Sequence, residues 1–136
     1  MIEPKVQQPT KAQEKAAYEL ATIRDGGVCQ RCRRDCGPIA RDHRKNRSTG
    51  GLTVASNLQL LGLACHTWKS EHPAAAAHDG WAVPGWPEAI PSEWPARRWV
   101  PGIAGILHKV WVLLDDAGGW VEISDAEAAR RMVGVP

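Results

Sequence analysis

Apolar residues recur at helical intervals along one long segment near the start of the chain. Five of them follow the three-to-four-residue spacing of an amphipathic helix: Ala12, Ala16, Ala17, Leu20 and Ile23. Thr10 and Gln13 stand at the spacing of a capping box, and residues 26–27 are Gly-Gly. The pattern therefore predicts a helix over about residues 11–24, with a thin and alanine-rich buried face.

Shorter runs follow this helix. Residues 37–43 ("GPIARDH") predict a short strand after a turn, and residues 44–51 ("RKNRSTGG") predict a loop. Residues 52–63 begin like a strand and contain a turn near their middle. A helix is expected over about 64–72, and the proline that follows opens a second short turn over 73–77.

The last part of the chain changes character. Residues 79–101 show neither a helical nor a strand period, and their four tryptophans alternate with prolines. We predict a rigid, irregular wrap whose indoles pack onto the core. Residues 109–123 predict a β-hairpin that turns near 116–119. A capping-box spacing then precedes a terminal helix at about 125–132.

Together these elements predict a small α+β protein with one main core, which is what 136 residues support. We divide the chain into three parts. Residues 1–27 form an N-terminal extension with a helix, and residues 28–76 form the functional core. Residues 77–136 form a Trp/Pro-rich extension that packs on that core.

The net charge of +2 is unevenly distributed. Residues 1–76 carry twelve Lys or Arg against seven Asp or Glu, whereas residues 77–136 carry five against eight. The first part is therefore basic, which indicates a working face directed at a polyanion.

The sequence contains no apolar run long enough to span a membrane. Its first fifteen residues lack the apolar stretch of a secretory signal. We therefore expect a cytoplasmic protein, in which four cysteines act as metal ligands or free thiols rather than as disulfides.

The four cysteines have the spacing of a metal site. Cys29 and Cys32 are separated by two residues, as in a zinc knuckle, while Cys36 follows closely and Cys65 lies about thirty residues further on. The simplest hypothesis places all four around one structural zinc ion. In the alternative, Cys36 is a free buried thiol and the fourth ligand is a histidine or water.

Residues 40–51 ("ARDHRKNRSTGG") place an acid–histidine pair, Asp42 and His43, inside a cluster of cations. Phosphodiester cleavage needs a general base, a divalent ion and cationic groups on the backbone, and this pair can supply the first two functions. His66, which follows Cys65, is a candidate second ligand. Alone, the pair could be ordinary surface, and a histidine at a helix start is commonly a packing or capping residue.

Five motifs stand in an order that resembles the HNH endonucleases of the zinc-containing type: "CQRC", "RDH", "GG", "SNLQLL" and "ACHTWK". They are most similar to the small HNH proteins of actinobacterial phages. The resemblance covers about residues 28–72. It implies a ββα-metal (His-Me finger) core, in which two short strands around a loop precede a helix, and a structural zinc beside it.

The resemblance also implies residue roles. His43 corresponds to the general base, Asp42 and His66 to the ligands of a catalytic Mg²⁺ or Mn²⁺ ion, and Asn57 to the residue that braces the loop orienting the base. One departure stands out. Zinc-type members usually have a second Cys-x2-Cys, and here its first position is Gly62. We expect Cys36 to occupy the vacant corner of the zinc site.

DNA is the partner that this reading implies, contacted through its backbone phosphates. The residues expected at the DNA are Arg31, Arg33, Arg34, Arg41, Arg44, Lys45, Arg47 and Lys69. The resemblance also suggests phage DNA-packaging proteins such as terminase as partners, and we expect a monomer. The main alternative is a non-catalytic, zinc-stabilised protein that binds nucleic acid. A second alternative places a protein interface in the tryptophan-rich part.

Overall fold

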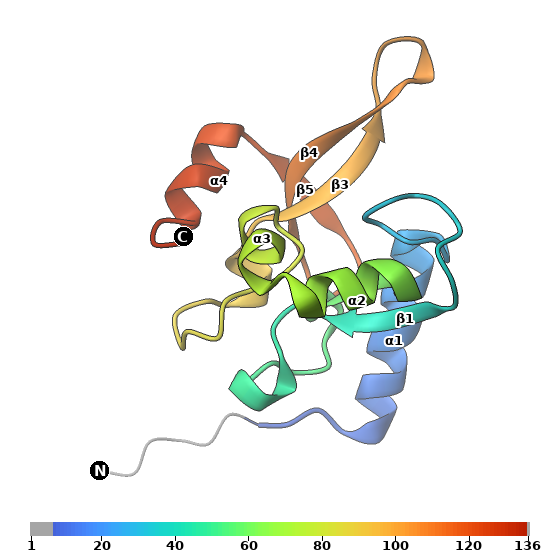
Figure 1. Cartoon of the computed structure of the whole chain (residues 1–136). Coiled ribbons are helices and arrows are strands. Elements are labelled where there is room, and N and C mark those ends of the chain that lie inside the picture. Colours follow the sequence, from blue (N-terminus) through green and yellow to red (C-terminus); the bar gives the residue numbers. More distant parts are fainter. Residues whose placement is uncertain (1–6, 136) are drawn as a thin grey trace.

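The computed structural model describes residues 7–135, which form two antiparallel sheets with helices around them (Figure 1). The first part of the chain contains α1 (Lys11–Asp25), β1 (Ile39–His43), β2 (Leu58–Gly62), α2 (Leu63–Glu71) and α3 (Pro73–His78). The second part contains β3 (Ala96–Pro101), β4 (Leu107–Leu114), β5 (Trp120–Ile123) and α4 (Asp125–Arg131). The predicted small α+β class is confirmed.

β1 and β2 form the first sheet, and α2 continues directly from β2. In the antiparallel register His43 lies opposite Leu58 and Asp42 opposite Gln59. α2 packs against both strands, so these three elements make a ββα unit. The predicted strand at 37–43 and helix at 64–72 are confirmed within two residues. The strand-like start of 52–63 is irregular, and pairing begins only at Leu58.

α1 supports this unit from the side of β2. Its start has the predicted capping box, in which Thr10 and Gln13 exchange hydrogen bonds. It ends at Gly26, whose φ of +65° lies in the left-handed region that glycine favours. Ala17 and Ala21 are buried against Leu58, so the small alanines let α1 approach the sheet closely.

β3, β4 and β5 form the second sheet in that order, and the predicted hairpin at 109–123 is confirmed as β4 and β5. The expectation of an irregular wrap is wrong for residues 96–101, which form β3. The two inward positions of this strand are Ala96 and Arg98. Because one of the inward positions is an arginine, the alternation of apolar and polar residues that identifies a strand cannot be recognised in this segment of the sequence.

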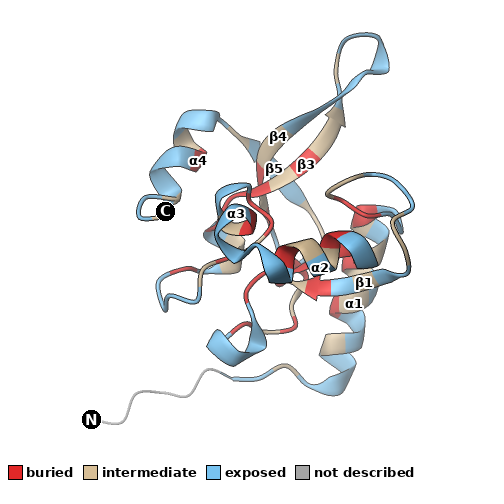
Figure 2. Ribbon diagram, viewed as in Figure 1, coloured by how far each residue is buried: buried red, intermediate tan, exposed pale blue. Residues whose placement is uncertain are grey.

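Buried residues lie mainly on β2, on one side each of α1 and α2, and in the segment of residues 81–96 (Figure 2). Trp81 and Trp94 are buried, as the expected packing of indoles requires, whereas Trp86 stays 38% exposed. Within residues 7–135 no helix is both long and apolar enough to cross a membrane.

Candidate functional site

The four cysteines lie together at the junction of the cysteine loop, defined here as residues 28–36, with α2. One sulfur atom from each of Cys29, Cys32, Cys36 and Cys65 lies within 4.8 Å of the others. Sulfur atoms bound to one tetrahedral zinc ion are separated by about 3.8 Å, since each Zn–S bond is about 2.3 Å. The geometry and the thiol chemistry therefore fit a zinc ion.

Cys36 takes the corner that Gly62 leaves open. A Cβ atom added to Gly62 would lie 2.2 Å from Cys36 Sγ, which is too close for two unbonded atoms. The sulfur of Cys36 thus fills the space that a side chain at position 62 would enter. A side chain at position 62 and the sulfur of Cys36 therefore compete for the same space.

The thiols differ in acidity. Burial acts to raise the pKa of Cys29, but backbone N–H donors from Cys32, Gly62 and Arg31 outweigh it and lower the pKa to about 7. Burial raises the pKa of Cys65 to about 12 although Arg31 lies 3.5 Å from its sulfur. Cys29 is therefore the thiol most ready to bind a metal as a thiolate.

Asp42, at the end of β1, and His66, in the first turn of α2, face each other. Asp42 Oδ1 lies 3.1 Å from His66 Nδ1, yet this buried nitrogen forms no hydrogen bond with any residue in the described range 7–135. An oxygen and a nitrogen atom about 3 Å apart, with no hydrogen bond between them, match two neighbouring ligand positions around an octahedral Mg²⁺ ion whose bonds are about 2.1 Å long. The pair therefore fits a divalent ion.

The other carboxylate oxygen of Asp42 is held in place. Asp42 Oδ2 forms an ion pair with Lys69 Nζ and accepts a hydrogen bond from Gln59 Nε2, each at 2.9 Å. Lys69 Nζ also donates to the backbone carbonyl of His43 at 2.8 Å. These contacts turn Oδ1 toward His66 and fix the position of His43 relative to Asp42.

His43 is half-buried beside α1 and the loop that follows β1. Its Nε2 lies 2.9 Å from Thr53 Oγ1 and 3.3 Å from Arg47 Nε, and the edge of the Tyr18 ring packs against it. Burial lowers the pKa of His43 below its ordinary value, and the charge of Arg47 lowers it further. The neutral imidazole is therefore the favoured form at neutral pH.

The side chain of Asn57 lies behind His43 and forms hydrogen bonds with the loop between β1 and β2. The side chain is fully buried, and its Oδ1 accepts a hydrogen bond from the backbone N–H of Lys45 at 2.7 Å. Its Nδ2 donates to the carbonyls of Lys45 and Leu52. Asn57 therefore ties both ends of the loop between β1 and β2 together.

Three expected DNA contacts are corrected by the structure. Arg44 is 1% exposed and donates to the carbonyls of residues 56, 91, 94 and 95. Lys45 is 6% exposed and donates to two carbonyls of the segment 86–89. Lys69 is equally inaccessible beside Asp42. These cations satisfy buried carbonyl and carboxylate oxygens, so they cannot reach phosphates.

The remaining expected cations stay accessible. Arg33, Arg34, Arg41 and Arg47 are exposed, and Arg31 is half-buried. Arg47 has contacts of its own with Tyr18, Thr53 and Glu14, so only part of its charge is free. The basic surface is smaller than the count of cations in the sequence suggests.

Thr53 and Gln59 are residues that sequence reasoning missed. Thr53 is 3% exposed and contacts the candidate base, while Gln59 holds the candidate metal ligand. Gln59 lies directly opposite Asp42 across the sheet, which points to a contact between them. This pairing can be recognised only after the register of the two strands is known. Thr53 lies in irregular backbone and gives no such signal.

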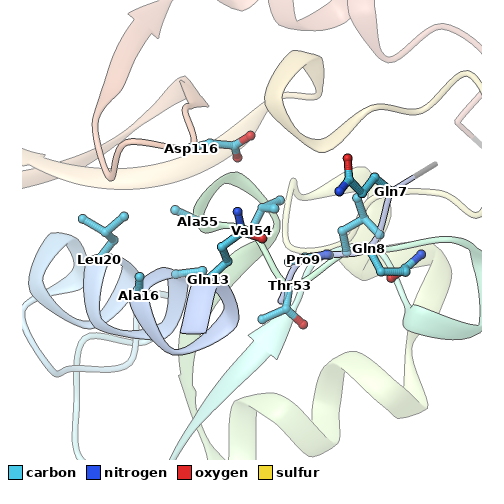
Figure 3. A pocket seen from close by; sticks show the side chains of 12 residues that line it. Gln7, Gln8, Pro9, Gln13, Ala16, Leu20, Thr53, Val54, Ala55 and Asp116 are labelled. Atoms are coloured by element: carbon cyan, nitrogen blue, oxygen red, sulfur yellow. The ribbon is translucent and has the colours of Figure 1, made fainter. Parts of the chain in front are cut away.

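A cavity of about 440 Å³ lies between α1, residues 52–55 and Asp116 (Figure 3). Apolar and amide side chains line most of it, and its one carboxylate, Asp116, accepts hydrogen bonds from the backbone and hydroxyl groups of Ser56. Thr53 alone connects it with His43. The cavity does not contain the chemistry of the site described above.

A family model described as HNH endonuclease matches residues 29–72, about a third of the chain. The matched segment contains the cysteine cluster, β1, β2 and α2. No curated protein and no solved structure matches the chain. The match assigns an HNH endonuclease domain to these residues and indicates nuclease or DNA-binding activity. The cytoplasmic location, the monomeric state and the packaging partners stay predictions.

Proposed function

We propose that the protein is an endonuclease that hydrolyses DNA phosphodiester bonds with a divalent metal ion and with His43 as general base. One observation carries the proposal. Asp42 Oδ1 and His66 Nδ1 converge without a hydrogen bond beside a half-buried histidine, inside the segment that matches HNH endonucleases. In this role His43 removes a proton from the water that attacks the phosphorus atom.

The contacts of His43 support this role. Arg47 Nε donates to His43 Nε2 at 3.3 Å, so Nε2 holds the lone pair while this contact is made. When the contact opens and Nε2 donates instead to Thr53 Oγ1, the lone pair lies on Nδ1, which makes no hydrogen bond with the described residues. The lowered pKa keeps that lone pair free at neutral pH. Lys69 holds the backbone of His43, and Asn57 holds the loop that follows.

Asp42 Oδ1 and His66 Nδ1 are the atoms that would hold the catalytic ion. A bound Mg²⁺ or Mn²⁺ supplies Lewis-acid stabilisation of the negative charge on the phosphate and on the leaving oxygen. The chain's own part is to keep the two donor atoms about 3 Å apart, through Gln59 and Lys69 on the far oxygen of Asp42. Such oxygen and imidazole donors suit these ions, whereas the thiol cluster suits zinc.

Zinc in the cysteine cluster is a structural part of the proposal. It would join the cysteine loop to α2, the helix that carries His66. The exposed arginines of the same domain, Arg33, Arg34 and Arg41, would contact backbone phosphates without reading sequence.

Nicking of supercoiled plasmid tests the proposal. Zinc-loaded protein with Mg²⁺ or Mn²⁺ should convert supercoiled DNA to open circles, and His43→Ala should lower the rate by at least about a hundredfold, since a general base contributes roughly 10²–10⁴. His78→Ala removes an exposed histidine of α3, outside the site, and is the matched control. Full activity of His43→Ala, with zinc content unchanged, would contradict the assignment.

One observation favours a second candidate, a zinc-stabilised DNA-binding protein without catalysis. Lys69 neutralises Asp42 at 2.9 Å, and Arg47 contacts the nitrogen of His43. Both cations occupy groups that catalysis needs. Tight binding to duplex DNA with no metal-dependent nicking would support this candidate over the nuclease.

A further inference from the structure

The β3–β4 hairpin projects away from the body of the molecule (Figure 1), and it carries cations stacked on tryptophans. The guanidinium of Arg97 lies 4.1 Å from the centre of the Trp111 ring, and Lys109 Nζ lies 5.4 Å from that of Trp99. Arg97 is opposite Trp111 in the register, and Trp99 is opposite Lys109. Cross-strand partners share a face, so the four side chains lie on one side of the hairpin.

This face continues onto the matched HNH segment. The indole N–H of Trp99 donates to the carbonyl of Arg31 at 3.3 Å. The guanidinium of Arg31 in turn lies 3.5 Å from the centre of the Trp68 ring on α2. Three cation–tryptophan pairs therefore run from the helix that carries His66 to the hairpin.

The cations of the hairpin keep their charge available. Within residues 7–135 neither Arg97 nor Lys109 has a side-chain hydrogen bond or a carboxylate partner. Arg98, on the opposite face of the same strand, is buried and paired with Asp25. A tryptophan ring orders a cation without neutralising it. The strand thus uses one arginine for folding and presents its neighbour to a polyanion.

The end of the hairpin is apolar. Ile103 is 92% exposed and Ile106 is 71% exposed, and the tip is coloured as exposed in Figure 2. Two isoleucines in water at the end of a cationic stem match the chemistry of minor-groove binders, which place cations at phosphates and insert apolar wedges between base steps.

We propose that the β3–β4 hairpin is a DNA-binding arm, in which Arg97 and Lys109 contact backbone phosphates while Ile103 and Ile106 wedge into the minor groove. The arm lies outside residues 29–72, and it rests on the proposed function only in taking duplex DNA as the substrate. It gives the tryptophan-rich part of the chain a role in binding the substrate.

The proposed phosphate contacts of Arg97 and Lys109 are tested by the salt dependence of DNA binding. Full-length, zinc-loaded protein is titrated onto a fluorescent duplex without Mg²⁺ or Mn²⁺, so that no cleavage occurs, over a series of KCl concentrations. Arg97→Gln with Lys109→Gln should reduce the slope of log affinity against log salt by about 1.8, since each phosphate contact contributes about 0.9. Arg130→Gln removes an exposed cation of α4 and should leave the slope unchanged.

The tip is tested in the same assay. Ile103→Ser with Ile106→Ser should lower the affinity at every salt concentration while leaving the slope unchanged, because no charge is removed. Energy transfer between dyes at the two duplex ends should report a bend with wild-type protein and none with this variant. Ile23→Ser, which changes an equally exposed isoleucine on α1, is the matched control.

The outcomes separate the arm from the nuclease. Wild-type nicking together with unchanged affinity and slope in both arm variants would overturn the arm and leave the nuclease standing. Duplex binding that depends on the arm, without nicking, would support the arm and overturn the nuclease. Absence of duplex binding by wild type would overturn both. Loss of self-association in the tip variant, with DNA affinity unchanged, would show that the tip joins copies of the chain and would overturn the arm.

Discussion

His43 and Arg44 are neighbours in sequence with opposite environments. His43 is half-buried and is disfavoured as a cation, whereas Arg44 is fully buried and is retained as one by carbonyl oxygens. Burial lowers the pKa of Arg44 to about 9, which still leaves the guanidinium charged at neutral pH. One step along the backbone thus separates a titrating group from a permanent charge.

The pKa of His43 should respond to Arg47. In zinc-loaded, magnesium-free protein we expect a pKa below the ordinary 6.5, and Arg47→Gln should raise it because a nearby positive charge is removed. The titration of the imidazole signals by NMR measures both values. Arg41→Gln, which changes an exposed cation of the same strand, should leave the pKa of His43 unchanged.

The lowered pKa of His43 also determines how the free energy of unfolding depends on pH. The folded state binds fewer protons than the unfolded chain between the lowered pKa of His43 and 6.5. The free energy of unfolding should therefore contain a contribution that is complete above pH 6.5 and is lost as the pH falls through the folded pKa. In His43→Gln this part of the pH dependence should disappear from urea unfolding curves.

Cys36 and Gly62 offer a swap of one metal ligand. Cys36→Ser should reduce tightly bound zinc below one ion per chain, and the double variant Cys36→Ser/Gly62→Cys should restore it. The backbone at Gly62 has a φ of −69°, which a cysteine adopts without strain, and the smaller serine hydroxyl at 36 can rotate away from the side chain added at 62. Zinc is counted by mass spectrometry of the metal.

The matched control moves the new thiol by one residue. Cys36→Ser/Leu63→Cys places it at a position that is 55% exposed and should not restore zinc. Zinc at one ion per chain in Cys36→Ser alone would show that Cys36 is not a ligand.

At the scale of elements, hydrogen bonds from buried cations help to hold the segment between α3 and β3 in place, beside its apolar contacts. The irregular segment between α3 and β3 forms no sheet ladder, and its carbonyls instead accept hydrogen bonds from Arg44 and Lys45. Long side chains from the loop after β1 therefore hold this segment against the ββα unit.

Arg44→Met should destabilise the protein by at least about 3 kcal/mol, because removal of the guanidinium leaves several buried carbonyls without a donor. Urea unfolding followed by tryptophan fluorescence measures the change. Arg130→Met, at an exposed position, should alter the free energy of unfolding by less than about 0.5 kcal/mol. Equal stability of the two variants would contradict the role given to Arg44.

The elements with a local signal were predictable. The capping box of α1, the strand ending at His43 and the helix after Gly62 were each found from short-range patterns. β3 was missed because Arg98 is stabilised by Asp25, which is far away in sequence. A local sequence pattern cannot reveal a partner so far along the chain. For the same reason it cannot predict that Arg44 points into the core.

In the candidate site, too, residues that belong to a sequence motif could be named in advance, whereas contacts set by the tertiary fold could not. The order of the motifs singled out Asp42, Asn57 and His66, which the fold places around His43, while their roles stay predictions. What the sequence could not give was the distinction between cations that face DNA and cations that face carbonyls. That distinction depends on the direction of each side chain, which the tertiary fold determines.

For the whole molecule, charge is distributed in an unusual way. Five cationic side chains lie inside the described fold together with only two carboxylates, Asp25 and Asp42. The cations are Arg24, Arg44, Lys45, Lys69 and Arg98. Backbone carbonyls compensate the excess, and many of these carbonyls belong to residues 81–98. The nuclease-like core therefore depends on the later part of the chain.

A chain ending at residue 78 should consequently fail to fold, even with zinc present, because Arg44, Lys45 and Gln59 lose their acceptors. Circular dichroism and dispersion of the NMR spectrum measure this. A chain ending at residue 124 loses α4 and the residues after it, which pack on Val83, Ala89 and Trp94, and should remain folded at lower stability. Cooperative unfolding of the shorter chain would show that the core is autonomous.

The placement of three cysteines in one short loop also bears on how the protein is made. Residues 29, 32 and 36 emerge from the ribosome close together, about thirty residues ahead of Cys65. A nascent chain can therefore take up the metal with three sulfurs and close the site when the helix arrives. With two ligands in each half of the site, only two sulfur atoms would be accessible before the second pair emerged. Moving a single ligand along the chain thus changes the moment during synthesis at which folding can begin.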